Sequence, residues 1–154
     1  MRARNRDAPD GAGAAYGLEH GVVGIGDALD APPAGPDDAA TAAADAHGAK
    51  AARMLRNFAE LDDGTYVWTY AGDGGYFLGR IAGAWRYDDS PAAREVGIHH
   101  VRPTTWLDRR FGDDEVPSAV AATFARGGRN FQRTRSERAE RRTAELWAEY
   151  GSGS

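Results

Sequence analysis

The residues best suited to binding a flat ligand are five aromatic side chains in the middle of the sequence: Trp68, Tyr70, Trp85, Tyr87 and Trp106. Aromatic rings stack on nucleobases, and each stacked base contributes about 1–3 kcal/mol. The same side chains also fill the cores of small β-barrels, because each buries a large apolar surface. Both roles are open for each of the five, and we expect at least two of them to line a pocket.

Basic residues that follow the aromatics are candidates for contact with phosphate groups: His100, Arg102, Arg109, Arg129 and Arg133. Residues 102–154 contain ten arginines against eight acidic residues, whereas residues 1–64 have six basic against eleven acidic residues. The planar guanidinium of arginine matches the geometry of phosphate oxygens. A solvated surface is the alternative role for the arginines, and ordering of the sheet is the alternative for His100 with Arg102.

Several kinds of catalytic site are excluded by the residue types that are missing or isolated. The chain has no cysteine, which excludes disulfides and thiolate metal sites and favours a reducing compartment. His99 and His100 are neighbours, so on a strand they point to opposite faces and cannot chelate one ion together. The single lysine, Lys50, has no acidic residue two positions before it, unlike the carboxylate–lysine core of restriction nucleases. We therefore expect no metal, no cofactor and no enzymatic activity.

Alternation of large and small residues between glycine turns predicts the strands that position the aromatics. Strands are expected at residues 21–26, 66–70 and 76–87 and within residues 96–107. Trp68 and Tyr70 point the same way on one strand, as do Trp85 and Tyr87 on another. Such pairs form either a slot or a layer of core. On the long strand, Gly79 and Gly83 indicate strong coiling, a bulge or the close approach of another backbone.

Helices are expected at residues 42–58, 117–126 and 136–150, with residues 88–94 as a loop. The predicted fold class is therefore α+β, a small curved β-sheet or barrel with flanking helices. We expect a disordered lead at residues 1–17, a β-barrel domain at 18–135, a C-terminal helix at 136–150 and a linker-like tail at 151–154. Apolar runs are too short to span a bilayer, and the basic N-terminus lacks the apolar core of a secretory signal. The expected location is the cytoplasm, without membrane contact.

The order of these motifs resembles a known family. The glycine-bounded strand Gly24-Ile25-Gly26 is followed by a helix, an acidic-glycine turn and the Val67-Trp68 strand. Next come the long strand at residues 76–87 and the segment His100-Val101-Arg102-Pro103-Thr104-Thr105-Trp106. This order is similar to that of the EVE-like modules at the front of Mrr- and McrB-type modification-dependent restriction proteins. The similarity covers about residues 21–133 and is sharpest at residues 64–106.

The resemblance implies a PUA-like β-barrel, a group that includes the YTH and SRA-type readers. Such a module would accept a flipped, modified base into an aromatic cage, as the specificity module of a restriction or defence system. The cage would be built from Gly26 and Asp27 together with the aromatics Trp68, Tyr70, Trp85, Tyr87 and Trp106. The expected partners are DNA carrying a modified base and an effector nuclease or NTPase.

The chain departs from the family where Asp27 follows the first strand, since many relatives have a tryptophan there. Asp27 would offer a hydrogen-bond acceptor to a base amino group in place of that aromatic wall. Thr104 replaces the aliphatic residue that is usual at its position. The alternative function is a protein-interaction or oligomerisation adaptor in which the aromatics form the barrel core. An open aromatic pocket beside Arg102 favours the reader, whereas a closed barrel favours the adaptor.

Overall fold

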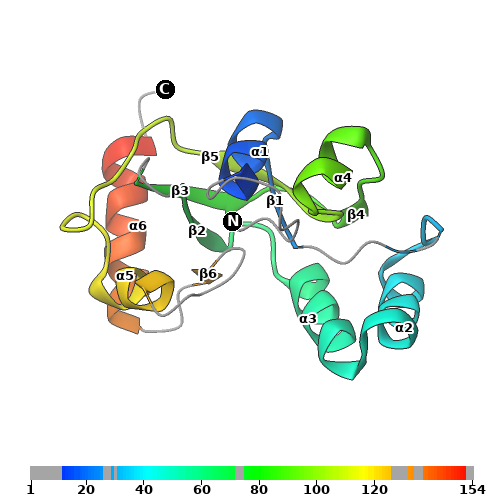
Figure 1. The fold of residues 1–154 in the computed structure, drawn as a ribbon. Coiled ribbons are helices and arrows are strands. Elements are labelled where there is room, and N and C mark those ends of the chain that lie inside the picture. Colours follow the sequence, from blue (N-terminus) through cyan, green and yellow to red (C-terminus); the bar gives the residue numbers. More distant parts are fainter. Residues whose placement is uncertain are drawn as a thin grey trace.

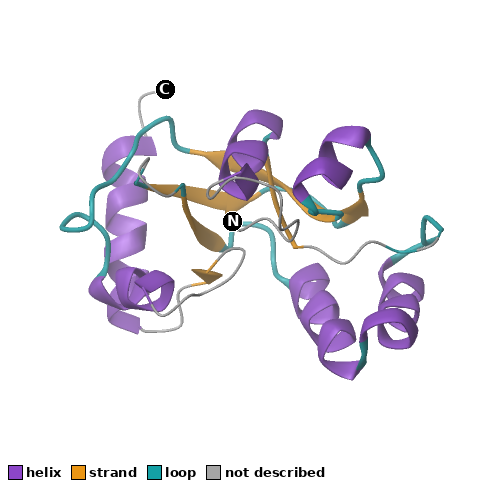
Figure 2. Ribbon diagram, in the orientation of Figure 1, coloured by secondary structure: helices purple, strands orange, loops and turns teal. Residues whose placement is uncertain are grey.

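The centre of the molecule is an antiparallel sheet curled into half a barrel and flanked by helices (Figures 1 and 2). The computed structural model describes residues 12–25, 29, 31–71, 75–125, 132–133 and 137–151. The mixed helix-and-strand class and the curved sheet are confirmed. The arrangement of the strands explains how residues far apart in the sequence come together.

The helices are α1 (Ala12–His20), α2 (Pro36–His47), α3 (Ala49–Glu60), α4 (Pro91–Val96), α5 (Ser118–Ala125) and α6 (Glu137–Gly151). The strands are β1 (Val22–Ile25), β2 (Tyr66–Tyr70), β3 (Tyr76–Ile81), β4 (Arg86–Tyr87), β5 (His100–Trp106) and β6 (Gln132–Arg133). The sheet order is β1-β5-β3-β2-β6, and β4 also pairs with β5. Strand β5 therefore connects the two halves of the sheet.

The predicted long strand at residues 76–87 is interrupted by a bulge. Ile81 of β3 pairs with Thr104 of β5, but Arg86 of β4 pairs with Val101. Four residues thus separate the two pairs on the β3–β4 side, against two on β5. Two extra residues bulge out of the sheet at positions 82–85, as the glycines in this strand suggested.

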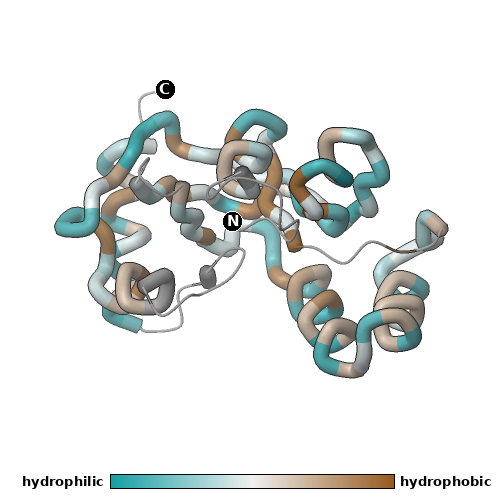
Figure 3. The backbone as a smooth tube through the Cα atoms, viewed as in Figure 1, coloured by the Kyte–Doolittle hydropathy of each residue, from teal (hydrophilic) through white to brown (hydrophobic). Residues whose placement is uncertain are grey.

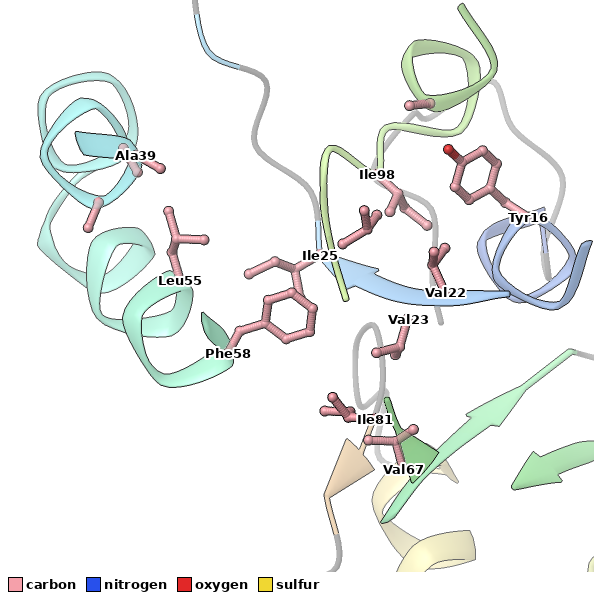
Figure 4. Close-up of a cluster of buried hydrophobic side chains, with 14 residues drawn as sticks. Tyr16, Val22, Val23, Ile25, Ala39, Leu55, Phe58, Val67, Ile81 and Ile98 are labelled. Carbon is pink, nitrogen blue, oxygen red and sulfur yellow. The ribbon is translucent and has the colours of Figure 1, made fainter. Parts of the chain in front are cut away.

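The two faces of β1 pack against different helices, as Figure 4 shows. Val22 points toward Tyr16 of α1 and toward Ile98, which follows α4, whereas Ile25 points toward Phe58 of α3. Helices α1 and α4 therefore cover one side of this half of the sheet, and α3 packs on the other. In Figure 3, β1 is coloured mainly as hydrophobic, whereas hydrophobic and hydrophilic residues alternate along α3.

A second core lies at the other half of the sheet, beneath α5 and α6. It contains Trp68, Leu78 and Phe111 from the sheet side and Val120 and Leu146 from the helices. Helix α6 is amphipathic, with Ala139, Thr143 and Leu146 buried at a spacing of three to four residues. The helix expected near the C-terminus is therefore part of the domain core.

Three expectations about local structure are corrected. Residues 12–17 belong to α1 rather than to a disordered lead, and Ala14 and Tyr16 of that helix are buried. The helix expected at residues 42–58 is two helices, because Gly48 between them adopts a positive φ of 99°. The expected loop at residues 88–94 contains the start of α4, which Ser90 caps by accepting a hydrogen bond from the Ala93 N–H.

Gly79 is required by the close approach of a neighbouring side chain. A Cβ at this position would lie 2.6 Å from the Trp106 ring and 2.8 Å from the Thr104 methyl group. Gly79 and Trp106 are paired across β3 and β5, so the indole ring lies over the glycine. The absence of a side chain here makes room for the ring on the sheet.

We expect Gly79→Ala to destabilise the domain by about 1–3 kcal/mol, the usual cost of adding a methyl group to a packed core. Chemical denaturation measures this change. Gly35→Ala is the matched control, because a Cβ at Gly35 meets nothing within 4 Å and the backbone there is extended. Equal stability of the two variants would show that the Trp106 ring moves aside for the added methyl group without loss of stability.

Candidate functional site

A cluster of four rings lies where β4 and the start of β5 meet. We call Trp85, Tyr87, His99 and His100 the histidine–aromatic cluster. The Trp85 and His100 rings are stacked with centroids 6.0 Å apart, and the Tyr87 and His99 rings are stacked at 5.6 Å. Tyr87 also meets His100 edge-on at 5.3 Å, consistent with the pairing of these two residues across β4 and β5.

The two histidines form the buried base of the cluster, and the two aromatics form its half-buried outer part. His99 and His100 are 4% and 1% exposed. The Trp85 indole N–H donates to Nδ1 of His100 at 3.3 Å, so this nitrogen acts as an acceptor and carries no proton. The imidazole thereby fixes the orientation of the Trp85 ring.

The chain that follows β1 reaches the cluster through Leu29. The Leu29 N–H donates to the Tyr87 hydroxyl at 3.0 Å. Gly26 and Asp27, which the resemblance placed in the base pocket, lie outside the described residues. A shallow pocket of about 410 Å³ adjoins this segment, between Leu29, Pro32 and Pro33 on one side and α2 on the other. None of the predicted site residues that the structure describes lines it.

Of the predicted pocket aromatics, Trp68 belongs to one core cluster, and Trp106 is partly buried and packs against the other. Trp68 is fully buried, meets Phe111 edge-on at 5.5 Å and donates its indole N–H to Oγ1 of Thr143 at 3.1 Å. The Trp106 indole N–H is bonded to the carbonyl oxygens of Gly17 and Val22 at 3.1 and 3.2 Å. The prediction that Trp68 lines a ligand pocket is wrong, since α6 covers its ring.

The slot between two aromatic pairs is also not formed. The strand pairing places Trp68 beside Leu78, whereas Tyr87 pairs with His100, on the same face of β5 as Trp106 and its partner Gly79. Because Leu78 and Gly79 are consecutive, they point to opposite faces of the sheet. Tyr70 lies on the Trp68 face, is 38% exposed and packs its ring 4.7 Å from that of Tyr76. The two predicted pairs therefore belong to different surfaces.

Arg102 is a buried structural residue, which corrects its predicted contact with phosphate. It is 3% exposed, and its Nε donates to the Gly83 carbonyl at 2.7 Å. Its Nη1 donates to the carbonyls of Phe58 and Ala59 at 2.9 and 3.3 Å, at the end of α3. Its Nη2 donates to Asp63 at 3.0 Å. All three nitrogens are used within the protein.

The other predicted phosphate contacts have different surroundings. His100 is buried within the cluster, so the prediction that it touches a nucleic-acid backbone is wrong. Arg109 forms an ion pair with Glu115 at 2.8 Å and lies over the Phe111 and Tyr150 rings at 4.5 and 4.1 Å. Arg129 lies outside the described residues. For Arg133 the structure describes the backbone, which pairs with Val67 in the sheet.

A hydrogen bond between α1 and the residue that follows β4 connects α1 to the histidine–aromatic cluster. The Tyr16 hydroxyl donates to the Asp88 carboxylate, and the Asp88 carbonyl contacts Nδ1 of His99 at 2.9 Å. Burial raises the pKa of Tyr16 to about 12, and the bond to Asp88 acts in the same direction. Burial alone would raise the pKa of Asp88, but the hydrogen bonds from Tyr16 and Ser90 outweigh it and lower this pKa below its ordinary value.

Comparisons with protein-family models, with curated proteins and with solved structures give no match to this chain. Among the described residues, histidine and carboxylate side chains nowhere gather in a group of three that could hold a metal ion. Within the same part of the chain, every helix is too short or too polar to cross a membrane.

Arg102→Lys should lower the free energy of unfolding by at least about 2 kcal/mol, because an ammonium group cannot reach the carbonyls of α3 and of the bulge together. Urea denaturation measures this loss. Arg110→Lys is the control, since Arg110 is exposed, and it should change stability by no more than about 0.5 kcal/mol. Similar small losses in both variants would contradict the structural role of Arg102.

Tyr16→Phe should destabilise the domain most near neutral pH. Asp88 has a lowered pKa in the folded state, so its contribution is present above its ordinary value of 3.8 and is lost as the pH falls below it. Tyr16 has a raised pKa, so its contribution is present below pH 10 and is lost as the pH rises toward 12. Unfolding of both proteins at pH 3, 7 and 11 measures the difference. A difference that does not vary with pH would contradict this coupling.

Proposed function

We propose that this chain is a non-catalytic nucleic-acid reader that holds a modified base of DNA against the histidine–aromatic cluster. In this proposal the curled sheet is a PUA-like half-barrel, and the chain is the specificity module of a restriction or defence system whose effector lies elsewhere. The observation that carries the proposal is the pair of half-buried aromatic rings, Trp85 and Tyr87, stacked on buried histidines.

The cluster suits a base that has left the DNA stack. Flipping a base out of a duplex costs a few kcal/mol, and stacking on an aromatic ring returns about 1–3 kcal/mol per base. A buried methyl group adds about 0.8 kcal/mol, so modification favours binding to a modest extent. Discrimination then depends on how closely the rings fit around the base.

The hydrogen bond to His100 makes Trp85 a suitable wall for such a base. A ring that is already oriented loses little conformational freedom when the ligand binds, and this improves affinity. Tyr87 is held in the same way from two sides, by the Leu29 N–H and by the His99 ring. Both aromatic walls are therefore preorganised in the protein without ligand.

An adaptor function is the second candidate, and the burial of Trp68 within the core favours it. In that case Trp85 and Tyr87 would also be structural. The exposed hydrophobic side chains Met54, Tyr70 and Tyr150, which are 36–40% exposed, would then contribute to contacts with a partner protein. Direct binding measurements distinguish the two functions.

The test is a salt-titrated binding assay with matched duplexes that contain cytosine, 5-methylcytosine, 5-hydroxymethylcytosine or N6-methyladenine. We expect at least a tenfold preference for one modified duplex, which corresponds to about 1.4 kcal/mol. Weak binding to all duplexes alike that disappears with salt would reject the reader. No binding to any duplex would favour the adaptor.

Trp85→Ala should abolish the preference for the modified duplex, because it removes one stacking wall, while the core that contains Trp68 remains. Tyr70→Ala is the matched control, since Tyr70 is a partly exposed aromatic on the opposite face of the sheet. It should leave the preference unchanged. If Trp85→Ala keeps the preference, the cluster is not the base site. Unfolding measured on both variants separates loss of binding from loss of structure.

A further inference from the structure

Helix α3 has an exposed basic face that the sequence analysis did not identify. Lys50, Arg53 and Arg56 are all exposed. They follow one another at intervals of three residues, so they lie along one side of the helix, opposite the buried Leu55 and Phe58. We call these three residues the α3 basic face.

Within the part of the chain that the structure describes, no ion pair neutralises the charges of this face. None of the three forms an ion pair with a described residue, in contrast to Arg94, Arg102, Arg109 and Arg142, each of which contacts a carboxylate. Glu60 is the one acidic residue within α3. The other acidic residues of the α2–α3 hairpin lie on α2, which has three aspartates and no lysine or arginine.

The local excess of positive charge runs against the composition of the surrounding chain. Residues 1–64 have a net charge of −5, from eleven acidic and six basic residues. Half of those six basic residues lie on this single helix. A face of this kind on an acidic chain attracts a strongly anionic partner.

Arg102 fixes the position of this face relative to the histidine–aromatic cluster. Its guanidinium binds the Phe58 and Ala59 carbonyls at the end of α3 and the Gly83 carbonyl, two residues before Trp85. The end of α3, two to three residues beyond Arg56, therefore lies close to the Trp85 segment, and the basic face extends away from this end along the helix. Figure 1 shows the α2–α3 hairpin projecting from the sheet on this side.

The length of the face matches a short run of nucleotides. Arg56 lies six positions after Lys50, which corresponds to about 9 Å along a helix with a rise of 1.5 Å per residue. Phosphates along one strand of DNA follow each other with a rise of about 3.4 Å per step. Three long, mobile side chains over this distance are able to reach two or three consecutive phosphates.

We propose that the α3 basic face binds backbone phosphates next to the nucleotide held at the histidine–aromatic cluster. This inference rests on the proposed function, and it assigns the phosphate contacts to α3 in place of Arg102 and His100. Phosphate contacts position a protein on nucleic acid without reading its sequence. The face should therefore contribute affinity, and the cluster should contribute preference for the modified base.

The test compares the full chain with its Lys50→Gln, Arg53→Gln, Arg56→Gln triple variant. Glutamine preserves helix propensity and removes the charge. We expect at least tenfold weaker binding at 50 mM salt to modified and unmodified duplexes alike. The slope of log affinity against log salt should become shallower by up to about 2.7, at about 0.9 per lost phosphate contact. The ratio of affinities for the two duplexes should not change.

The matched control removes three exposed arginines from α6, as Arg138→Gln, Arg141→Gln and Arg142→Gln. The charge change is identical, but these arginines alternate with Glu137, Glu140 and Glu145. Binding should weaken less than threefold. An equal loss in both triple variants would mean that net charge alone sets affinity, and this would overturn the assignment to α3.

The remaining outcomes separate the inference from the proposed function. Wild-type binding with a modified-base preference, together with unchanged binding by the α3 variant, would overturn the inference and leave the reader intact. Absence of wild-type binding to every duplex would overturn both. Loss of the modified-base ratio in the α3 variant, with overall affinity unchanged, would also overturn the phosphate assignment.

Discussion

The bonding of the buried Arg102 guanidinium is the constraint on which the rest of the structure depends. A cation removed from water is stable when acceptors surround it, and all three nitrogens of Arg102 find acceptors, on three separate segments. The acceptors on α3 are carbonyls in the last turn of the helix, at its negative end. One side chain of β5 therefore fixes the angle of α3, the shape of the bulge and the start of the Trp85 segment together.

The alternation of residues correctly predicted where the strands lie, but it did not predict which face of each strand is covered by a helix. Strands β1, β2 and β5 fall where the sequence indicated, and the glycines at positions 79 and 83 correctly suggested irregularity in the long strand. Alternation states which residues share a face, but it does not say which face meets a helix. Trp68 and Tyr87 are indistinguishable in that respect, and α6, more than 60 residues later in the chain, decides that Trp68 is core.

Arg102 could not be recognised from its neighbours in the sequence, because its partners lie 19 to 44 residues away. The sequence around an arginine on a strand shows the same alternation whether its side chain faces a phosphate group or the protein interior. Other signals were present but weak. Ser90-Pro91 and Gly97 are typical of the start and end of a helix, yet α4 has six residues, fewer than a periodic pattern needs to be detected. The basic residues of α3 can be read from the sequence, but their common face on the helix follows only when α3 is known to begin after Gly48.

The number of residues in the bulge has a consequence for how this sequence tolerates change in length. Two extra residues, rather than one, separate β3 from β4, so the alternation of faces continues across the interruption. Removal of one residue from positions 82–85 would turn Tyr87 to the opposite face and separate it from His100. Removal of two would restore a regular ladder and keep Tyr87 on its face, but a deletion that includes Gly83 would take away the carbonyl that Arg102 binds. Substitutions at the exposed positions Ala82 and Ala84 of the bulge should therefore be accepted far more readily than insertions or deletions.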